Sequence, residues 1–428
     1  MTVPDADGLA AMVRPDAVHR DAYKNPAVFA LEMERIFKGT WVFVGHESEV
    51  ANPGDYRTLR IGNEPVIFVR DDGGVLRVLV NRCRHRAATV CQWEAGNARS
   101  FRCEYHGWTY RADGRLVGVT HPDRYDDDLR DTRGLVSVAK VDSYRGLVFA
   151  SFNPQVPELV DHLGPAAVEY LDRWLDHAGG RPLVAMAQAH RLIIPSNWKL
   201  QVENGLDGYH GGFVHRSFFN LMQARTGKSV RYASGLPTAQ AKAFRHGHAA
   251  VDPETTSRQP LVNRIAVLPH ATELLESMRK RVGDDIYEGL LAALPGPGIN
   301  IGIFPNLQLI GIHLRRIEPV SVDRAVVSVR PLLLADGPPE FNELRMRYHE
   351  LFYGPAGFGQ PDDIEMFDRV DDGLADDTDN WLLFSRGITQ ETEDGEVRTG
   401  NVSDETPQRA QYREWVRLMT AGASAADG

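Results

Sequence analysis

Four residues in one short stretch carry side chains that are strong metal ligands. The pair Cys83-x-His85 is followed, after 17 residues, by the pair Cys103-x-x-His106. Thiolates and imidazoles bind zinc and iron–sulfur clusters, so the two pairs supply four ligands from two separate loops. The 428-residue chain has only three cysteines, and all of them lie within residues 81–108. This crowding indicates a metal site, because structural cysteines have no reason to cluster with histidines.

Two kinds of metal centre fit a set of two cysteines and two histidines. Zinc binds such a set tetrahedrally, commonly with the cysteines paired in one turn and the histidines paired on one helix. A Rieske [2Fe–2S] cluster binds two thiolates on one iron and two imidazoles on the other. Each loop of this sequence supplies one cysteine and one histidine, which favours the two-iron cluster. We expect the third cysteine, Cys91, to be an inert buried side chain.

A second group of possible ligands lies in "ENGLDGYHGGFVH", residues 203–215. Asp207 and His210 are three residues apart, a spacing that places two side chains on one face of a helix. His215 follows after two glycines and can fold back towards the same ion. Two imidazoles and one carboxylate form the ligand set of non-haem Fe(II) oxygenases, which leave positions open for O2 and substrate. Electrons that enter through a [2Fe–2S] cluster would be used at such an iron.

The elements that would position these residues change along the chain. Residues 27–38 have apolar positions at helical spacing. From about residue 40 to 153, short β-branched runs such as "PVIFVR" and "VLRVLVN", joined across "DDGG", predict an all-β unit with the cysteine pairs at strand ends. We expect an N-terminal helical segment at 1–39 that packs on the catalytic domain, a cluster-binding domain at 40–155 and a second domain at 156–420.

The second domain combines helical and strand patterns. Helical periodicity covers residues 156–178, 340–353 and 361–374, and residues 307–334 predict two long strands. Residues 223–260 lack periodicity and are expected to form a long loop, as is the acidic stretch "QETEDGEVRTGNVSDETP". The predicted fold class is therefore α+β, with an antiparallel sheet in this domain.

Composition and charge exclude several classes of protein. The hydrophobic content of 43% and the charged content of 25% are ordinary for a globular protein. A net charge of −10 argues against nucleic acid as a partner. The chain has no long apolar run and no signal-peptide pattern, and three cysteines cannot form a disulfide framework, so we expect a cytoplasmic protein without a membrane span. No G-x-G-x-x-G follows a strand, so a nicotinamide or flavin cofactor would bind to another protein.

From about residue 20 to 415, the chain resembles the large (α) subunits of Rieske non-haem iron aromatic-ring-hydroxylating oxygenases. "CRH…CEYHGW" is similar to the cluster motif of that family. "NWKLQVENGLDGYH" is similar to its iron motif, most closely in members that act on benzoate, anthranilate, salicylate and terephthalate. The stretch at 13–50 is similar to salicylate hydroxylase large subunits, and "GPAGFGQPDDIEMF" resembles the segment that carries the carboxylate ligand.

The resemblance implies that Cys83, His85, Cys103 and His106 hold a Rieske cluster. One departure is visible in the first loop. Members of the family usually have glycine after the arginine that follows the first ligand histidine, whereas this chain has Ala87.

The resemblance also implies that His210 and His215 hold a mononuclear iron. Asp363 would supply the carboxylate, with the neighbouring Asp362 as its rival. Asp207 matches an aspartate that, in the family, links an iron-binding histidine to a cluster-binding histidine of the neighbouring subunit. The four residues Asp207, His210, His215 and Asp363 are thus the expected catalytic residues.

The resemblance implies a β-sandwich for the cluster domain and, for the catalytic domain, a helix-grip (START-like) antiparallel sheet surrounded by helices. The implied function is hydroxylation of an aromatic ring, in a monocyclic aromatic carboxylate, by O2 and by electrons from NADH. A separate flavin reductase, a ferredoxin or both would deliver the electrons. The resemblance also implies a homotrimer or an α3β3 assembly with a small β subunit. The expected location is a bacterial cytoplasm. Mono- and dioxygenation both stay open, as do two alternatives, an O-demethylase of a methoxy-aromatic acid and a zinc-stabilised ligand-binding protein.

Overall fold

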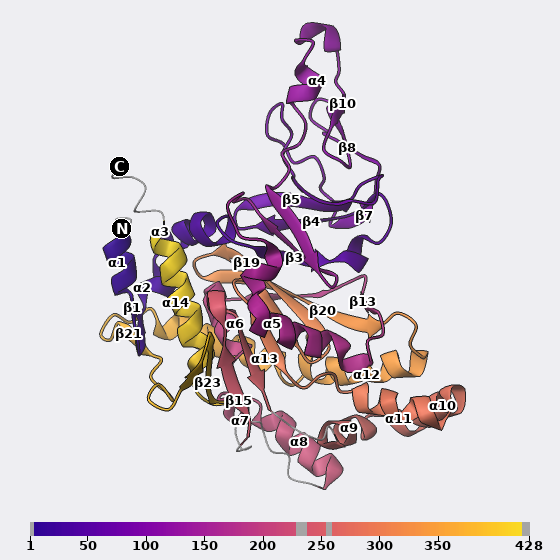
Figure 1. The fold of residues 1–428 in the computed structure, drawn as a ribbon, viewed down its shortest axis with the longest axis vertical. Coiled ribbons are helices and arrows are strands. Elements are labelled where there is room, and N and C mark those ends of the chain that lie inside the picture. The colour runs from indigo at the N-terminus through magenta and orange to yellow at the C-terminus, as the bar shows by residue number, and fades with distance from the viewer. Residues whose placement is uncertain (1–3, 228–237, 254–258, 422–428) are drawn as a thin grey trace. The chain divides into compact units, whose positions relative to one another are not determined.

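The computed structural model describes residues 4–227, 238–253 and 259–421. The chain forms two compact units. The smaller unit is Met33–Leu159, and the larger unit combines Met1–Glu32 with Val160–Gly428. Figure 1 shows the helices and strands of each unit. Within the described ranges, no helix has the length and apolar character needed to cross a membrane.

Three antiparallel sheets build the smaller unit. Their strand orders are β6-β5-β4-β7, β11-β12-β3 and β10-β9-β8. The strands are β3 (Val42–His46), β4 (Asp55–Ile61), β5 (Glu64–Arg70), β6 (Leu76–Val80), β7 (Ala95–Asn97), β8 (Ser100–Arg102), β9 (Thr109–Arg111), β10 (Leu116–Gly118), β11 (Lys140–Tyr144) and β12 (Leu147–Ser151). The hairpin predicted at "DDGG" joins β5 to β6, and the Asp71 carboxylate accepts hydrogen bonds from the backbone of Gly73 and Val75 in that turn. The predicted β character of this stretch is confirmed.

The two cysteine-bearing segments of the smaller unit are loops, one between β6 and β7 and the other between β8 and β9. A core that includes Ile67, Leu79, Phe101 and Tyr110 lies beneath them. The short helical segments of this unit are η1 (Met33–Phe37), η2 (Glu47–Val50), η3 (Pro122–Arg124) and α4 (Leu129–Thr132). Because both loops leave strands that share one core, their ends are fixed by that packing.

A ten-stranded antiparallel sheet forms the centre of the larger unit. Its order is β13-β20-β19-β18-β17-β16-β15-β23-β22, and β14 also pairs with β20. The strands are β13 (Leu183–Ala185), β14 (His190–Ile194), β15 (Gln240–Ala243), β16 (Ala249–Asp252), β17 (Asn300–Ile303), β18 (Leu307–Ile310), β19 (His313–Ser321), β20 (Arg324–Leu334), β22 (Thr392–Asp394) and β23 (Val397–Asn401). A small second sheet contains β1 (Val13–Arg14), β2 (Ala17–His19) and β21 (Trp381–Leu383).

Helices pack around the large sheet (Figure 1). In particular, α6 packs on β19, α12 on β20, α13 on β14, and α14 on β15 and β16. The helices are α1 (Ala6–Ala11), α2 (Asp21–Lys24), α3 (Pro26–Glu32), α5 (Leu159–Leu175), η4 (Asp176–Ala178), α6 (Trp198–Asn204), α7 (Gly211–Val214), α8 (Arg216–Thr226), η6 (Arg245–Gly247), α9 (Gln259–Ala266), α10 (Ala271–Val282), α11 (Asp284–Ala293), α12 (Pro339–Tyr353), α13 (Gln360–Gly373) and α14 (Thr406–Thr420). The α+β class, the helices at 156–178, 340–353 and 361–374, and the antiparallel sheet are confirmed.

Two expected loops contain strands of the large sheet instead. Within 223–260, the described residues include the end of α8 and strands β15 and β16, and residues 228–237 and 254–258 lie outside the described part. Alanines fill these strands, and their small side chains are buried where α14 packs on them. Alanine has low strand propensity, so tertiary packing overrides the local signal. The acidic stretch forms the β22–β23 hairpin, with β23 paired to β15 and the charged β22 at the sheet edge.

The prediction of two strands over residues 307–334 was wrong in number. The segment forms three strands, β18, β19 and β20, because a turn at Gly311 separates the first two. Gly311 has a φ of 57°, a left-handed conformation that glycine adopts without steric cost. After this turn, β19 and β20 form the longest antiparallel pairing in the sheet.

Candidate functional site: two groups of metal ligands

The segment with the two expected iron-binding histidines is only partly helical. Helix α6 begins after Asn197, whose side chain accepts a hydrogen bond from the backbone of Lys199, and it ends at Asn204. His210 directly precedes the one-turn helix α7, and His215 directly follows it. The expectation that Asp207 and His210 share a helical face was therefore wrong, because α6 ends at Asn204 and residues 205–210 are not helical.

The structure nevertheless brings the three expected iron ligands together. Oδ1 of Asp363 lies 3.6 Å from Nε2 of His210 and 3.4 Å from Nε2 of His215. The two imidazole rings have centroids 5.2 Å apart and stand at 79° to each other. The possible ligand atoms of all three residues lie within 4.8 Å of one another. This is the arrangement of two imidazoles and one carboxylate around a single ion.

The structure distinguishes Asp363 from its rival Asp362. Asp363 lies in the first turn of α13, is buried, and points to both histidines. The Asp362 side chain is 40% exposed, and its Oδ2 atom comes no closer than 3.9 Å to His215, on the Nδ1 side of that ring. Asp362 therefore lies outside the group formed by the other three side chains.

The electrostatics of this group suit a divalent cation. Burial raises the pKa of Asp363, because a carboxylate in a low-dielectric site lacks the hydration that stabilises its charge. Burial also lowers the pKa of His215 to about 4, so its imidazole is neutral at pH 7 and its Nε2 lone pair is free to bind a metal. A cation between these atoms would stabilise the carboxylate charge, so the residues present fit a mononuclear iron.

Asp207 contacts His210 from the side opposite to Asp363. Its Oδ2 atom lies 3.2 Å from Nδ1 of His210, and its Oδ1 atom accepts a hydrogen bond of 2.6 Å from the backbone of Tyr209. Burial alone would raise the pKa of Asp207, but the contacts with His210 outweigh it and the pKa is lowered. Burial alone would lower the pKa of His210. The neighbouring carboxylates of Asp207 and Asp363 outweigh the effect of burial, so the pKa of His210 is raised. A carboxylate on Nδ1 directs Nε2 towards the metal position.

Asn204 is a site residue that the sequence reasoning missed. Its Nδ2 atom lies 3.3 Å from Oδ1 of Asp363 and 3.4 Å from Nε2 of His210. The residue is the last of α6, so the helix end delivers its amide into the ligand group. Its place six residues before His210, in the same motif, was the available signal.

The first pair of loops also brings its expected ligands together. The rings of His85 and His106 have centroids 4.5 Å apart, and Cys83 and Cys103 are both buried with interacting thiols. Nδ1 of His85 is buried and has no hydrogen-bond partner among the described residues. Two thiols and two imidazoles thus converge, with a ring nitrogen left free for a ligand role, and fit a [2Fe–2S] cluster.

The two loops share one backbone design. In each, the amide of the fourth residue after the cysteine donates to the cysteine carbonyl, at 3.0 Å for Ala87 and 2.9 Å for Gly107. In each, the cysteine amide donates to the carbonyl of the fifth residue, at 2.8 Å in both loops. Both fourth residues have positive φ, 64° for Ala87 and 75° for Gly107. Ala87, the departure from the family pattern, therefore stands where a left-handed conformation is required.

Tyr110 is a second residue missed by the sequence reasoning. Its hydroxyl lies 3.3 Å from Sγ of Cys83 and accepts a hydrogen bond of 3.0 Å from the backbone of Arg84. Because the hydroxyl oxygen accepts from Arg84, its proton is free to point to the sulfur. Hydrogen bonds to cluster sulfurs raise the reduction potential. Cys91 is buried, as expected, and its backbone is held by Asn81.

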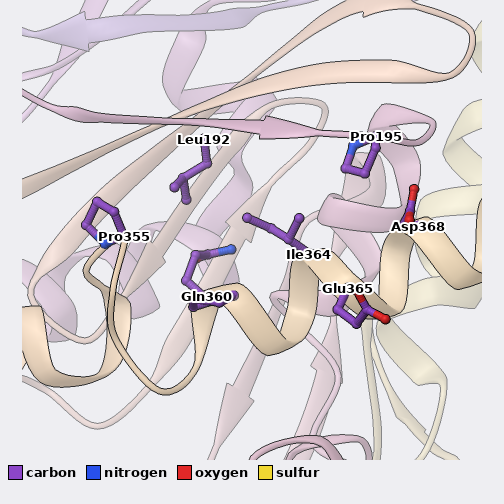
Figure 2. A pocket seen from close by; sticks show the side chains of 8 residues that line it. Leu192, Pro195, Pro355, Gln360, Ile364, Glu365 and Asp368 are labelled. Atoms are coloured by element: carbon purple, nitrogen blue, oxygen red, sulfur yellow. The ribbon is translucent and has the colours of Figure 1, made fainter.

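A surface groove of about 310 Å³ lies along helix α13, which carries Asp363 (Figure 2). It is formed by residues of β14, of α13 and of the segments next to them: Leu192, Pro195, Pro355, Gln360, Pro361, Ile364, Glu365 and Asp368. A helix turns by about 100° per residue, so Glu365 and Asp368 are on the far side of α13 from Asp363. The groove is therefore not the space in front of the metal ligands.

A β unit with two cysteine–histidine loops, and an α+β unit with two histidines and one carboxylate, define the class of Rieske-type non-haem iron oxygenases. Comparison with known families agrees with this class. Residues 40–144 match the Rieske [2Fe-2S] domain, and residues 171–421 match the catalytic domain of the ring hydroxylating alpha subunit. The chain belongs to the family of ring-hydroxylating oxygenase alpha subunits, so it carries a Rieske [2Fe–2S] cluster and a mononuclear iron. The zinc-stabilised alternative is thereby excluded.

Curated relatives and solved structures extend the comparison. The 2-halobenzoate 1,2-dioxygenase large subunit of Burkholderia cepacia is 32% identical over 86% of this chain and 79% of the relative. The anthranilate 1,2-dioxygenase large subunit of Acinetobacter baylyi is 33% identical over 88% of this chain and 81% of the relative. The structure of naphthalene 1,2-dioxygenase from Rhodococcus sp. bound to indole is similar with a TM-score of 0.76 and 27% identity, covering 95% of this chain and 94% of that one.

The left-handed position at Ala87 generates a prediction about the cluster loops. Replacing Ala87 with Gly should raise the free energy of unfolding by roughly 0.5–1 kcal/mol, since glycine adopts positive φ without the Cβ clash. Replacing Gly107 with Ala should lower it by about 1–2 kcal/mol, because its Cβ would also lie 3.0 Å from Oγ1 of Thr120. Thermal loss of the cluster's visible absorption in both variants measures the effect. Midpoints that move in the same direction for both would contradict the shared backbone design.

Proposed function

We propose that this chain hydroxylates the ring of a monocyclic aromatic carboxylate. The family makes it the ring-hydroxylating terminal oxygenase of a multi-component system, which uses O2 and receives electrons from partner proteins. The observation that carries the proposed substrate is the set of relatives, whose names specify 2-halobenzoate, anthranilate and toluate. The electrons come from NADH through a partner reductase, with or without a ferredoxin, because the chain has no dinucleotide motif of its own.

Within this proposal, each group of ligands has one cofactor. His210, His215 and Asp363 bind the mononuclear iron, which their mutual distances support. The four cluster ligands are Cys83, His85, Cys103 and His106. Residues 40–155 form the Rieske domain and residues 156–420 form the catalytic domain. Of the N-terminal segment at 1–39, the part up to Glu32 belongs to the larger unit with the catalytic domain, and residues 33–39 belong to the smaller unit. The matches at 40–144 and 171–421 support these boundaries.

The chain's own residues prepare the site for the reaction. When bound, the two metal centres supply single electrons and the activation of O2 beside the aromatic ring. Asp207 holds the His210 ring with Nε2 towards the metal position, and burial keeps His215 neutral. The Phe352 ring packs edge-on against His215 and against Phe218, with centroid distances of 5.0 and 4.7 Å. These rings line the ligand group with apolar surface, which excludes water and suits an aromatic substrate.

Electron transfer between the centres is proposed to cross between subunits. In this arrangement, one carboxylate oxygen of Asp207 contacts His210 and the other faces the partner subunit's His106. A head-to-tail ring of three subunits provides three such contacts, because heterologous interfaces of this kind close into a ring. The assembly would be a homotrimer or an α3β3 hexamer with a small β subunit.

A Rieske O-demethylase of a methoxy-aromatic acid is the second candidate. It would use the same metal ligands, and the same carboxylate-binding chemistry, on a methoxy group in place of a ring carbon. The relatives named above are ring dioxygenases, which favours ring hydroxylation.

The two neighbouring aspartates give a test of the iron ligands. Asp363→Ala should remove the mononuclear iron and at least about 100-fold of the turnover, because one of three ligands is lost. The matched control is Asp362→Ala, which removes the same side chain one residue away and should retain the iron. Iron analysis after anaerobic purification, with the Rieske absorption as an internal standard, measures both variants. Loss of iron from the Asp362 variant alone would assign the ligand to Asp362.

The proposed substrate class is tested by turnover with a surrogate reductase and NADH. Benzoate, salicylate, anthranilate and terephthalate should include at least one substrate, with product formation matched to O2 consumption. Methoxybenzoates in the same panel test the O-demethylase. If only neutral hydrocarbons such as naphthalene are oxidised and every acid is inert, the proposed substrate class is wrong.

Mixed assemblies test the route between subunits. Chains with Cys83→Ala lack the cluster, chains with His210→Ala lack the iron, and each preparation should be inactive alone. In mixed rings, about one interface in four joins an intact cluster to a neighbour's intact iron, so that fraction of activity should return. Asp207→Ala should keep both metal centres and lose turnover. No recovery in the mixture would place electron transfer within one chain.

A further inference from the structure

A second polar cluster lies inside the larger unit, on strand β19 and helix α12. Strand β19 contributes His313 and Arg315, which are two residues apart and so point to the same face of the sheet. Helix α12 contributes His349 and Tyr353. The ring centroids of His313 and His349 are 4.9 Å apart, those of His313 and Tyr353 are 4.7 Å apart, and the Arg315 guanidinium carbon lies 5.6 Å from the Tyr353 ring.

The guanidinium of Arg315 is buried without a carboxylate. The residue is 2% exposed, and in the described part of the chain its one hydrogen bond runs from Nε to Nε2 of His313, at 3.1 Å. On the same two elements, Glu318 pairs with Arg316 at 2.8 Å and Glu350 lies 3.4 Å from His190. The charge of Asp363 acts on Arg315 without forming an ion pair with it among the described residues. A buried guanidinium that is not paired is costly, and a bound anion would offset that cost.

The histidines next to Arg315 add hydrogen-bond donors and no charge. Because Nε2 of His313 accepts from Arg315, the ring proton of His313 is on Nδ1, and that atom has no partner among the described residues. His349 is 1% exposed, and neither of its nitrogens has a partner within the same residues. Burial lowers the pKa of His349 to about 3 and that of His313 well below its usual value, so both rings are neutral. One cation and two neutral N–H donors therefore lie next to one another in this cluster.

This cluster adjoins the proposed iron ligands. The Tyr353 ring packs against the ring of Phe352 at a centroid distance of 4.7 Å, and the Phe352 ring packs in turn against His215. A ligand held by Arg315 and stacked beside Tyr353 would therefore extend towards the metal position. A monocyclic ring is small enough to lie in that direction.

We propose that Arg315, with the N–H groups of His313 and His349, binds the carboxylate of the aromatic acid and so sets substrate class and ring position. The inference rests on the proposed function and names the residues that recognise its substrate. A guanidinium binds a carboxylate through two parallel hydrogen bonds, which fix the plane and direction of the acid as well as its position. The ring carbon presented to the metal would follow from that geometry.

The same place is less suited to a cation. His190, His349 and Glu350 offer ligand atoms within 4.8 Å of one another. The charge of Arg315 nevertheless acts on His349, and a second positive charge beside an unpaired guanidinium is repelled. An anion gains from the charge of Arg315 and from the free N–H donors, whereas a cation held by His190, His349 and Glu350 would be repelled by that charge.

Equilibrium binding tests the proposal without requiring turnover. Calorimetry of the anaerobically purified protein should show that benzoate binds at least 10-fold more tightly than benzamide, its neutral analogue of the same shape. Arg315→Gln should weaken benzoate binding by roughly 10- to 100-fold, the usual effect of losing a charged hydrogen bond in a buried site, and change benzamide binding by less than about 3-fold. Equal binding of the two ligands to the unaltered protein, or an unchanged benzoate affinity in Arg315→Gln, would overturn it.

Arg316 provides the matched control. It is the next residue on β19, faces the opposite side of the sheet, and pairs with Glu318. Arg316→Gln removes the same charge from the same strand and should leave the ratio of benzoate to benzamide affinity within about 3-fold. If Arg315→Gln does not fold, Arg315→Lys is the second variant, which keeps the charge and loses the two parallel N–H groups of the guanidinium. It should retain a preference for benzoate and should lower regioselectivity in turnover, and a benzamide preference in that variant would also overturn the proposal.

The outcomes separate this inference from the proposed function. Arg315-dependent binding of benzoate, with no turnover of any aromatic acid, would retain the carboxylate site and remove the proposed reaction. Turnover of an aromatic acid with the same kcat/KM in Arg315→Gln and in the unaltered protein would retain the reaction and remove Arg315 from substrate recognition.

Discussion

The carboxylate of Glu32 is the contact on which the catalytic geometry depends most. This fully buried side chain, at the end of α3, accepts hydrogen bonds from Nζ of Lys199 at 2.6 Å, from Nε1 of Trp198 at 2.9 Å and from Nε1 of Trp415 at 2.7 Å. It thereby ties the beginning of α6 to the N-terminal segment and to α14. A buried ion pair is stabilising only when its remaining hydrogen-bonding positions are filled, and here two indoles fill them. Removing one partner would leave the other charge buried and unpaired.

A second carboxylate continues this network at the other end of α6. Glu203 accepts hydrogen bonds from the hydroxyls of Tyr23 and Tyr412, at 2.8 and 2.5 Å, and burial raises its pKa to about 7. Both ends of α6 are thus fixed to residues near the two ends of the chain. The next residue, Asn204, places its amide among the metal ligands, and the turn with Asp207 and His210 begins directly after it. Hydrogen bonds form only within a narrow range of direction and distance, so they are suited to holding ligands in place.

The two metal sites solve the problem of ligand placement in different ways. The cluster loops repeat one backbone pattern, so each loop positions its own cysteine and histidine through local hydrogen bonds. The proposed iron ligands flank α7 or lie in α13, which are far apart in the chain, and only packing of these helices brings Asp363 to His210 and His215. The proposed carboxylate-binding cluster is a third case, because sheet register and the face of α12 decide which side chains meet Arg315. The stretch of sequence that each site spans is shortest for the cluster loops, intermediate for residues 313–353 around Arg315, and longest for the proposed iron ligands at 210–363.

The kind of contact that assembles each site also decides what could be predicted from the sequence. Cys83, His85, Cys103 and His106 were identifiable by type and spacing, since short loops between strands bring close neighbours in sequence together. The triad could be named in part, but the choice of Asp363 over Asp362 depends on how α13 is rotated against the histidines. The sequence of α13 does not specify that rotation. Tyr110 and Arg315 escaped notice because a phenol or an arginine has no distinctive spacing, and Asn204 because its contact with Asp363 joins residues distant in sequence.

The fold shows the same division between local and tertiary determinants. Strands with alternating or β-branched residues, and helices with apolar residues at helical spacing, were predictable because the pattern that identifies them also buries them. The alanine-rich β15 and β16 and the acidic β22–β23 hairpin had no such pattern, and they are strands because neighbouring strands and α14 give them partners. The sequence by itself determined which chemistry the chain carries, because ligand types and local spacing are properties of the chain. Only the tertiary structure decided which carboxylate and which cation face that chemistry, because these side chains meet through packing between segments distant in sequence.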